Sequence, residues 1–138
     1  MKKFRNWVTF AVVLAMVLSL AVGVSATSSS VMDGHYGTIS GTSYQNSTSP
    51  ATLYTSSRMS KNPDSARFVI DVDYNDGENY LTALSQNSSR GITSFTYTFP
   101  IYFTFDAIPN MAYVSHCVQD GTKYASKATY TSAPLTIN

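Results

Sequence analysis

Cysteine is nearly missing from this chain, because Cys117 is the only one among 138 residues. A disulfide within the chain is therefore excluded, although small exported domains often depend on such bonds for stability. Stability must come from an apolar core, to which a metal ion or oligomerisation could add. An intermolecular disulfide stays open, but a buried thiol is the better interpretation, because the alternate positions from 111 to 117 are the more apolar side of their strand.

Charge is scarce too, at 12% of the residues. Beyond the first 26 residues, six basic and eight acidic side chains leave a net charge of −2. A weakly acidic chain lacks the positive surface by which nucleic-acid-binding proteins attract phosphates, so no nucleic-acid partner is expected. The sequence also has no basic amphipathic segment, so binding to a membrane surface is not expected.

Beyond residue 26 the sequence also lacks an apolar pattern of helical period, and strict alternation takes its place. The most aromatic stretch, 92–105, places Phe95, Tyr97 and Phe99 between hydroxyl-bearing residues. This period of two predicts a strand with one buried face. Pro100 then marks an edge, a bulge or a crossing between sheets, because proline cannot donate to a strand ladder. The alternation is expected to resume at Ile101, Phe103 and Phe105.

A further strand is predicted over 66–74. Asp76-Gly77 follows it as a two-residue hairpin turn, which places Val72 opposite Leu81. The side chains expected on its buried face are Phe68, Ile70, Val72 and Tyr74.

A second hairpin is predicted around Asp120-Gly121, with strands over 111–119 and 122–131. It places Cys117 opposite Tyr124 on the more apolar face and leaves His116 on the other face, as a surface histidine.

Strands at roughly ten-residue spacing with turn residues between them indicate an all-β fold. The expected architecture is a small antiparallel β-sandwich, Ig-like or jelly-roll-like, or a small barrel. The expected organisation is a signal peptide (1–26), a flexible Ser-rich leader (27–35) and a single all-β domain (36–138).

The first 26 residues have the layout of a bacterial signal peptide. Basic residues open it, an apolar run (7–22) follows, and Val24-Ser25-Ala26 offers the small residues that signal peptidase requires. The run is short for a membrane span, so an uncleaved anchor is the weaker alternative and no stable span is expected after cleavage. The prediction is a secreted protein starting at Thr27, with non-covalent attachment to the cell wall as an alternative.

Asp71, Asp73 and Asn75 form a candidate calcium site, because alternating oxygen ligands suit this hard cation. The spacing departs from the EF-hand pattern: Gly77 comes one position late, and Thr82 stands where a bidentate glutamate is needed. An acidic strand face beside a turn explains the same residues, so no cofactor is the primary expectation.

Catalysis is not expected from the residues around His116. Its neighbours Ser115 and Cys117 would point to the opposite face of a strand, away from the imidazole. No Gly-x-Ser-x-Gly elbow is present. A hydrolase would need His116 to meet a serine and an acid from other strands.

Tyrosine is the abundant residue, with ten in the chain. Exposed tyrosine among Ser, Thr and Asn gives adaptable contact area for a partner and stacks on sugar rings. Strand propensity alone would also place tyrosine in a sheet, so a purely structural role is the alternative. Those expected in the core are Tyr74, Tyr97 and Tyr113. The candidate binding residues are Tyr36, Tyr44, Tyr54, Tyr80, Tyr102 and His116.

The sequence therefore predicts a secreted or cell-surface, non-catalytic interaction module that binds a glycan or an extracellular protein. The alternative is a small secreted toxin. The layout of a signal peptide followed by a short, Ser/Thr/Tyr-rich chain resembles that of lactococcin-like bacteriocin precursors. The resemblance concerns layout alone, and the region after residue 26 has no tryptophan, so no residue role follows from it.

Overall fold

The computed structural model describes residues 26–61 and 64–137, which form eight β-strands and no helix. This part of the chain therefore holds no helix that could span a bilayer. The expected signal peptide, except Ala26, lies outside the described residues. The strands are β1 (Thr27–Asp33), β2 (Gly37–Thr48), β3 (Ala51–Met59), β4 (Arg67–Asn75), β5 (Tyr80–Arg90), β6 (Ser94–Pro100), β7 (Met111–Asp120) and β8 (Tyr124–Pro134).

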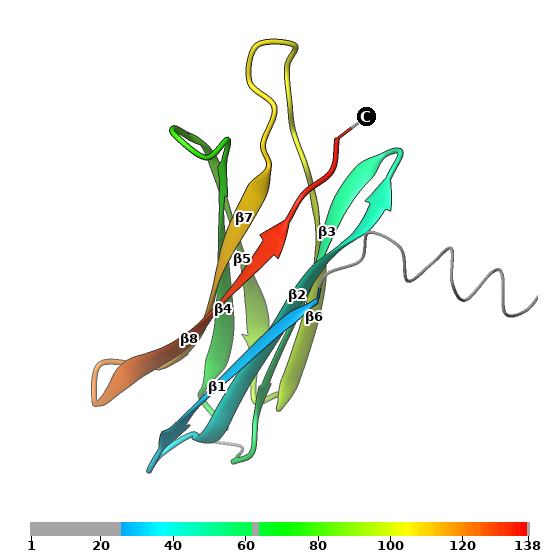
Figure 1. Ribbon diagram of the computed structural model, residues 1–138. Helices are drawn as coiled ribbons and strands as arrows, with labels where there is room; N and C mark the ends of the chain where they lie inside the picture. Colours follow the sequence, from blue (N-terminus) through cyan, green and yellow to red (C-terminus); the bar gives the residue numbers. More distant parts are fainter. Residues whose placement is uncertain (1–25, 62–63, 138) are drawn as a thin grey trace, which may run out of the picture.

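The strands form two antiparallel sheets of four, with the orders β1-β2-β3-β6 and β5-β4-β7-β8. The two sheets face each other as layers, and loops gather at the two ends of the strands (Figure 1). The chain crosses between layers after β3, β5 and β6, so that β3 pairs with β6 while β4 pairs with β7. The all-β class expected from the alternating pattern is confirmed.

Alternate side chains of both sheets fill the space between the layers, in two apolar clusters separated by a polar band. The larger cluster contains Ala51, Leu53, Ile70, Val72, Tyr74, Phe99, Ile101, Ala112, Val114, Ala133 and Leu135. The smaller contains Tyr36, Ile39, Met59, Ala66, Phe68 and Val118. The polar band consists of Ser43, Thr55, Ser57, His116 and Thr131. Every buried side-chain nitrogen and oxygen of the described residues has a hydrogen-bond partner, so the band is compatible with a stable core.

The buried face of β4 is as predicted, because Phe68, Ile70, Val72 and Tyr74 are all fully buried. The Tyr74 hydroxyl also donates a hydrogen bond of 3.0 Å to the carbonyl of Pro100. The placement of Tyr113 in the core is wrong, since 49% of this side chain is exposed on the outer side of β7.

The turn between β4 and β5 is longer than predicted. Asp76 Oδ1 accepts hydrogen bonds from the backbone N–H groups of Glu78 (2.9 Å) and Asn79 (2.7 Å), which closes a four-residue turn. The longer turn shifts the pairing by two residues and a bulge between Tyr74 and Asn75 shifts it by one more, so Val72 faces Leu84 rather than Leu81. The carboxylate that caps its own turn and the bulge together set the register, and the Asp-Gly pair alone reveals neither.

The second hairpin also has a shifted register, and its inward face is the opposite of the predicted one. Cys117 pairs with Ala128 rather than Tyr124 and is half-buried on the outer side of β7. The inward side chains of β7 include Val114, His116 and Val118. The prediction failed because it treated His116 as a surface residue, whereas hydrogen bonds within the band satisfy the buried imidazole.

Two further segments differ from expectation. Residues 27–33, expected as a flexible leader, form β1, whose Thr27 hydroxyl donates a hydrogen bond of 2.5 Å to the Ser132 carbonyl of the facing sheet. β6 ends at Pro100, and residues 101–110 form a projecting loop instead of a continued strand (Figure 1). Phe105 is 96% exposed in this loop rather than buried.

Candidate functional site

His116 lies in the centre of the core and not on the surface. Its Nδ1 is hydrogen-bonded to Ser57 Oγ at 2.8 Å, and its Nε2 to Thr131 Oγ1 at 2.8 Å. Thr131 Oγ1 is in turn 2.7 Å from Ser43 Oγ, so the ring and three hydroxyl groups form one chain of hydrogen bonds. Burial lowers the pKa of His116 to about 4, so this imidazole is neutral at physiological pH.

This Ser57–His116 pair is not arranged for hydrolysis. Both side chains are buried between the sheets, where a substrate from solvent cannot reach them. The second imidazole nitrogen bonds Thr131, whereas a catalytic histidine would use it to bond an acid. The arrangement therefore connects the two sheets.

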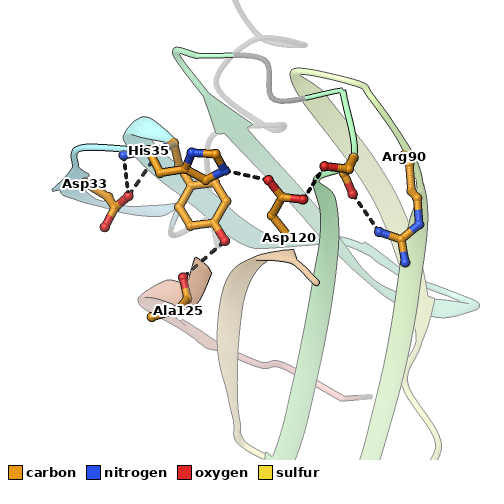
Figure 2. A network of polar contacts seen from close by, with 7 residues as sticks. Asp33, His35, Arg90, Asp120 and Ala125 are labelled. Carbon is orange, nitrogen blue, oxygen red and sulfur yellow. Dashed lines mark hydrogen bonds and ion pairs between the residues drawn. The ribbon is translucent and has the colours of Figure 1, made fainter. Parts of the chain in front are cut away.

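The second histidine belongs to a separate network near the β1–β2 turn, shown in Figure 2. His35 Nε2 lies 2.5 Å from Asp120 Oδ2, and the Ser65 hydroxyl donates to the other carboxylate oxygen. The hydrogen bond from Ser65 is the largest cause that lowers the pKa of Asp120, followed by the contact with His35. His35 also stacks on Tyr124, with ring centroids 3.6 Å apart.

This network, too, lacks the order of a catalytic triad. The carboxylate of Asp120 stands between Ser65 and His35, so the imidazole is not placed to take the serine proton. Arg90 Nη1 donates to the Ser65 carbonyl at 2.6 Å and extends the network to β5. The contacts join four segments that are far apart in sequence, which is a structural role.

The three candidate calcium residues lie on the same, outer side of β4. Asp71 and Asp73 project from the exposed side of β4, while Asn75 Oδ1 accepts a hydrogen bond of 2.7 Å from the Gly77 N–H. In the described ranges no group of three or more His, Cys, Asp or Glu side chains is placed to hold a metal ion.

The structure separates the six candidate binding residues. Tyr36 and His116 are fully buried, and the Tyr36 hydroxyl donates a hydrogen bond of 3.1 Å to the Ala125 carbonyl. Tyr44 and Tyr54 are direct cross-strand partners on the outer side of β2 and β3, with stacked rings 4.7 Å apart. Tyr80 and Tyr102 are exposed at the end of the molecule that bears the 101–110 loop.

The outer face of the β1-β2-β3-β6 sheet is lined by hydroxyl groups, and we call it the hydroxyl face. One row crosses all four strands through Ser28, Thr42, Ser56 and Thr96, which are register partners. The neighbouring row on one side contains Tyr44, Tyr54 and Thr98, and the neighbouring row on the other side contains Ser30, Ser40, Arg58 and Ser94. Arg58 is the one charged side chain that points outward from these four strands, all of which are described.

A hollow of about 540 Å³ adjoins the hydroxyl face at the loop end, and we call it the aromatic hollow. Residues 48–51 line it on one side and residues 100–103 on the other. Tyr102 is 60% exposed and Phe103 is 46% exposed, so both rings are accessible there. Thr52 pairs with Pro100, which lines the hollow. Because Thr52 is also two residues from Pro50 of the hollow and two residues from Tyr54 of the hydroxyl face, the two surfaces are continuous.

A hydroxyl-rich sheet face with tyrosines was expected from the sequence, but its serine and threonine residues were not selected as site residues, and neither was Phe103. The signal for the face is present, because Ser and Thr alternate through 38–44, 52–58 and 94–98. Phe103 gave no signal, since its place in an alternating run predicted burial.

Comparison of this chain with protein-family models, with curated proteins and with solved structures finds no match.

Proposed function

We propose that this chain is an exported, non-catalytic interaction module that binds a neutral glycan at the aromatic hollow and the adjoining hydroxyl face. Export and cleavage after Ala26 belong to the proposal and rest on the composition of the first 26 residues. The pairing of β3 with β6 and of β4 with β7 supports a β-sandwich, Ig-like or jelly-roll-like, whose loops present the binding surface.

The observation that carries the proposal is the continuity of exposed aromatic rings with rows of hydroxyl groups. Tyrosine rings stack on the apolar faces of sugars, while hydroxyl groups exchange hydrogen bonds with sugar hydroxyls. The volume of the hollow falls within the range of ligand pockets, roughly 300–1,000 Å³. The scarcity of charge on this face favours an uncharged ligand over an ionic one.

We expect Tyr54→Ala and Tyr102→Ala each to weaken binding to isolated cell walls or to an arrayed glycan by roughly five- to thirtyfold, since each removes an aromatic contact of about 1–2 kcal/mol. Binding of the purified protein to both materials is the measurement. Tyr130→Ala is the matched control, because Tyr130 is 69% exposed on the other sheet. An equal loss in the control, or no saturable binding by the wild type, would contradict the proposal. Binding to whole cells but not to polysaccharide would indicate that this surface binds a protein partner instead of a glycan.

The same assay tests calcium. Asp73→Asn and added chelator leave binding unchanged if the ligand needs only the aromatic hollow. Loss of binding under both conditions would instead make Asp71, Asp73 and Asn75 part of a calcium-dependent site.

The toxin alternative is favoured by one specific observation, the exposure of Phe105 at the projecting loop. An apolar side chain in such a position can enter the interfacial region of a membrane. Under this alternative the purified protein releases dye from vesicles or kills related cells, and Phe105→Ser reduces the effect several-fold while Tyr130→Ser does not. An inert protein in both assays removes the alternative.

A further inference from the structure

The geometry points to a second binding site, for a phosphate group, at the end of the molecule opposite to the aromatic hollow. Arg90, Arg67 and Gln119 are register partners across β5, β4 and β7 and form one row on the outer face of their sheet. They line a hollow of about 340 Å³ together with Gly121 and Ser126. Two guanidinium groups, an amide and a hydroxyl thus share one opening.

The two arginines face each other without a carboxylate between them. Like charges placed directly opposite in neighbouring strands destabilise a sheet. Among the described residues, neither arginine has an acidic group within ion-pair distance. The carboxylate of Asp120, on the inward side of the sheet, is bonded by Ser65 and His35, and its interaction with the charge of Arg90 offsets only part of the repulsion. An anion bound in the hollow would relieve this repulsion.

Charge is also separated along the molecule. The six basic side chains of the described residues all lie toward this end, together with three acidic ones, which gives it a net charge of +3, although the described residues together carry six basic and eight acidic side chains. The basic residues are Arg58, Lys61, Arg67, Arg90, Lys123 and Lys127, and the acidic ones are Asp33, Asp64 and Asp120. A field of this kind raises the local concentration of anions and their rate of arrival.

The side chains favour a phosphate group over other anions. Guanidinium forks bind tetrahedral oxyanions in two-point contacts, and two forks side by side match the several oxygens of a phosphate. One hydrogen bond positions each guanidinium group: Arg90 Nη1 donates to the Ser65 carbonyl at 2.6 Å, and Arg67 Nη2 lies 3.5 Å from Gln119 Oε1. Gly121, which has no side chain and a φ of +62°, leaves the turn beside the hollow open.

Calorimetric titration of the purified protein with inorganic phosphate at low ionic strength tests the site, with chloride as the control anion. We expect saturable binding of one phosphate per chain, weakened at least about tenfold by Arg67→Gln. Arg58→Gln removes the same charge from the hydroxyl face and should change the affinity less than about twofold. No saturable binding, or an equal loss in Arg58→Gln, would overturn the inference.

Thermal unfolding supplies a second readout. Without phosphate, Arg67→Gln should be at least as stable as the wild type, because it removes a repulsion. Phosphate should raise the midpoint of the wild type alone. A destabilised Arg67→Gln protein that phosphate still stabilises would count against the site. Vesicles with and without phosphatidylglycerol show which kind of molecule carries the phosphate. Adsorption to the anionic vesicles that is lost in Arg67→Gln indicates a lipid head group. Binding of inorganic phosphate without adsorption to vesicles indicates a soluble phosphate.

Discussion

Gly41→Ala is expected to lower the free energy of unfolding by about 3 kcal/mol, a large effect for one methyl group. A Cβ atom on Gly41 would lie 2.2 Å from both Cγ and Cδ2 of His116. The imidazole cannot move aside, because Ser57 and Thr131 hold its two nitrogens and the ring is buried. The alanine itself adds no backbone strain, since Gly41 does not have a positive φ. Urea unfolding followed by circular dichroism gives the measurement.

Two variants separate this clash from a general effect of losing glycine. Gly34→Ala is the matched control, because a Cβ atom there meets nothing within 4 Å, and its stability should stay within about 0.5 kcal/mol of the wild type. In the His116→Ala background, Gly41→Ala should cost about 2 kcal/mol less than it does in the wild type, since the clashing ring is gone. Additive costs in the double variant would show that the ring and Gly41 are not in contact.

Mild acid is expected to destabilise the protein, because the buried imidazole of His116 resists protonation. Burial lowers the pKa of His116 from 6.5 to about 4. Above pH 6.5 the imidazole is neutral in both the folded and the unfolded chain, and the fold has its full stability. Between pH 6.5 and about 4 the His116 imidazole binds a proton in the unfolded chain but stays neutral in the folded protein. The free energy of unfolding therefore falls, by about 3 kcal/mol in total.

Urea unfolding at a series of pH values measures this loss. His116→Gln keeps a polar side chain but cannot titrate, so its stability should change little between pH 6.5 and 4, whatever its stability at pH 7. The carboxyl groups of Asp33, Asp76 and Asp120 have pKa values below 3.8, because they accept hydrogen bonds, and their contributions disappear at lower pH. A His116→Gln profile as steep as that of the wild type would show that other groups cause the loss.

The candidate site was only partly accessible to sequence reasoning. Tyr44, Tyr54 and Tyr102 were selected as exposed tyrosines and do lie on the surface. Tyr36 and His116 were selected by the same reasoning and are buried, because hydrogen bonds from distant segments satisfy their polar atoms. Polarity predicts exposure only where no partner is supplied within the core, and the partners here are 15 to 89 residues away in sequence.

The sequence by itself determined the all-β class and the buried face of β4, because both depend on the local alternation of apolar and polar side chains. Only the tertiary structure decided which face of β7 is inward, that residues 27–33 join a sheet, and that Phe105 projects into solvent. The first two depend on contacts between segments far apart in the chain: the hydroxyls of Ser57 in the facing sheet and Thr131 in β8 for His116, and β2 and β8 for β1. The third depends on where the pairing of β6 with β3 ends, at Pro100. A local pattern does not contain such contacts, because the free energy that selects them comes from groups brought together by the fold.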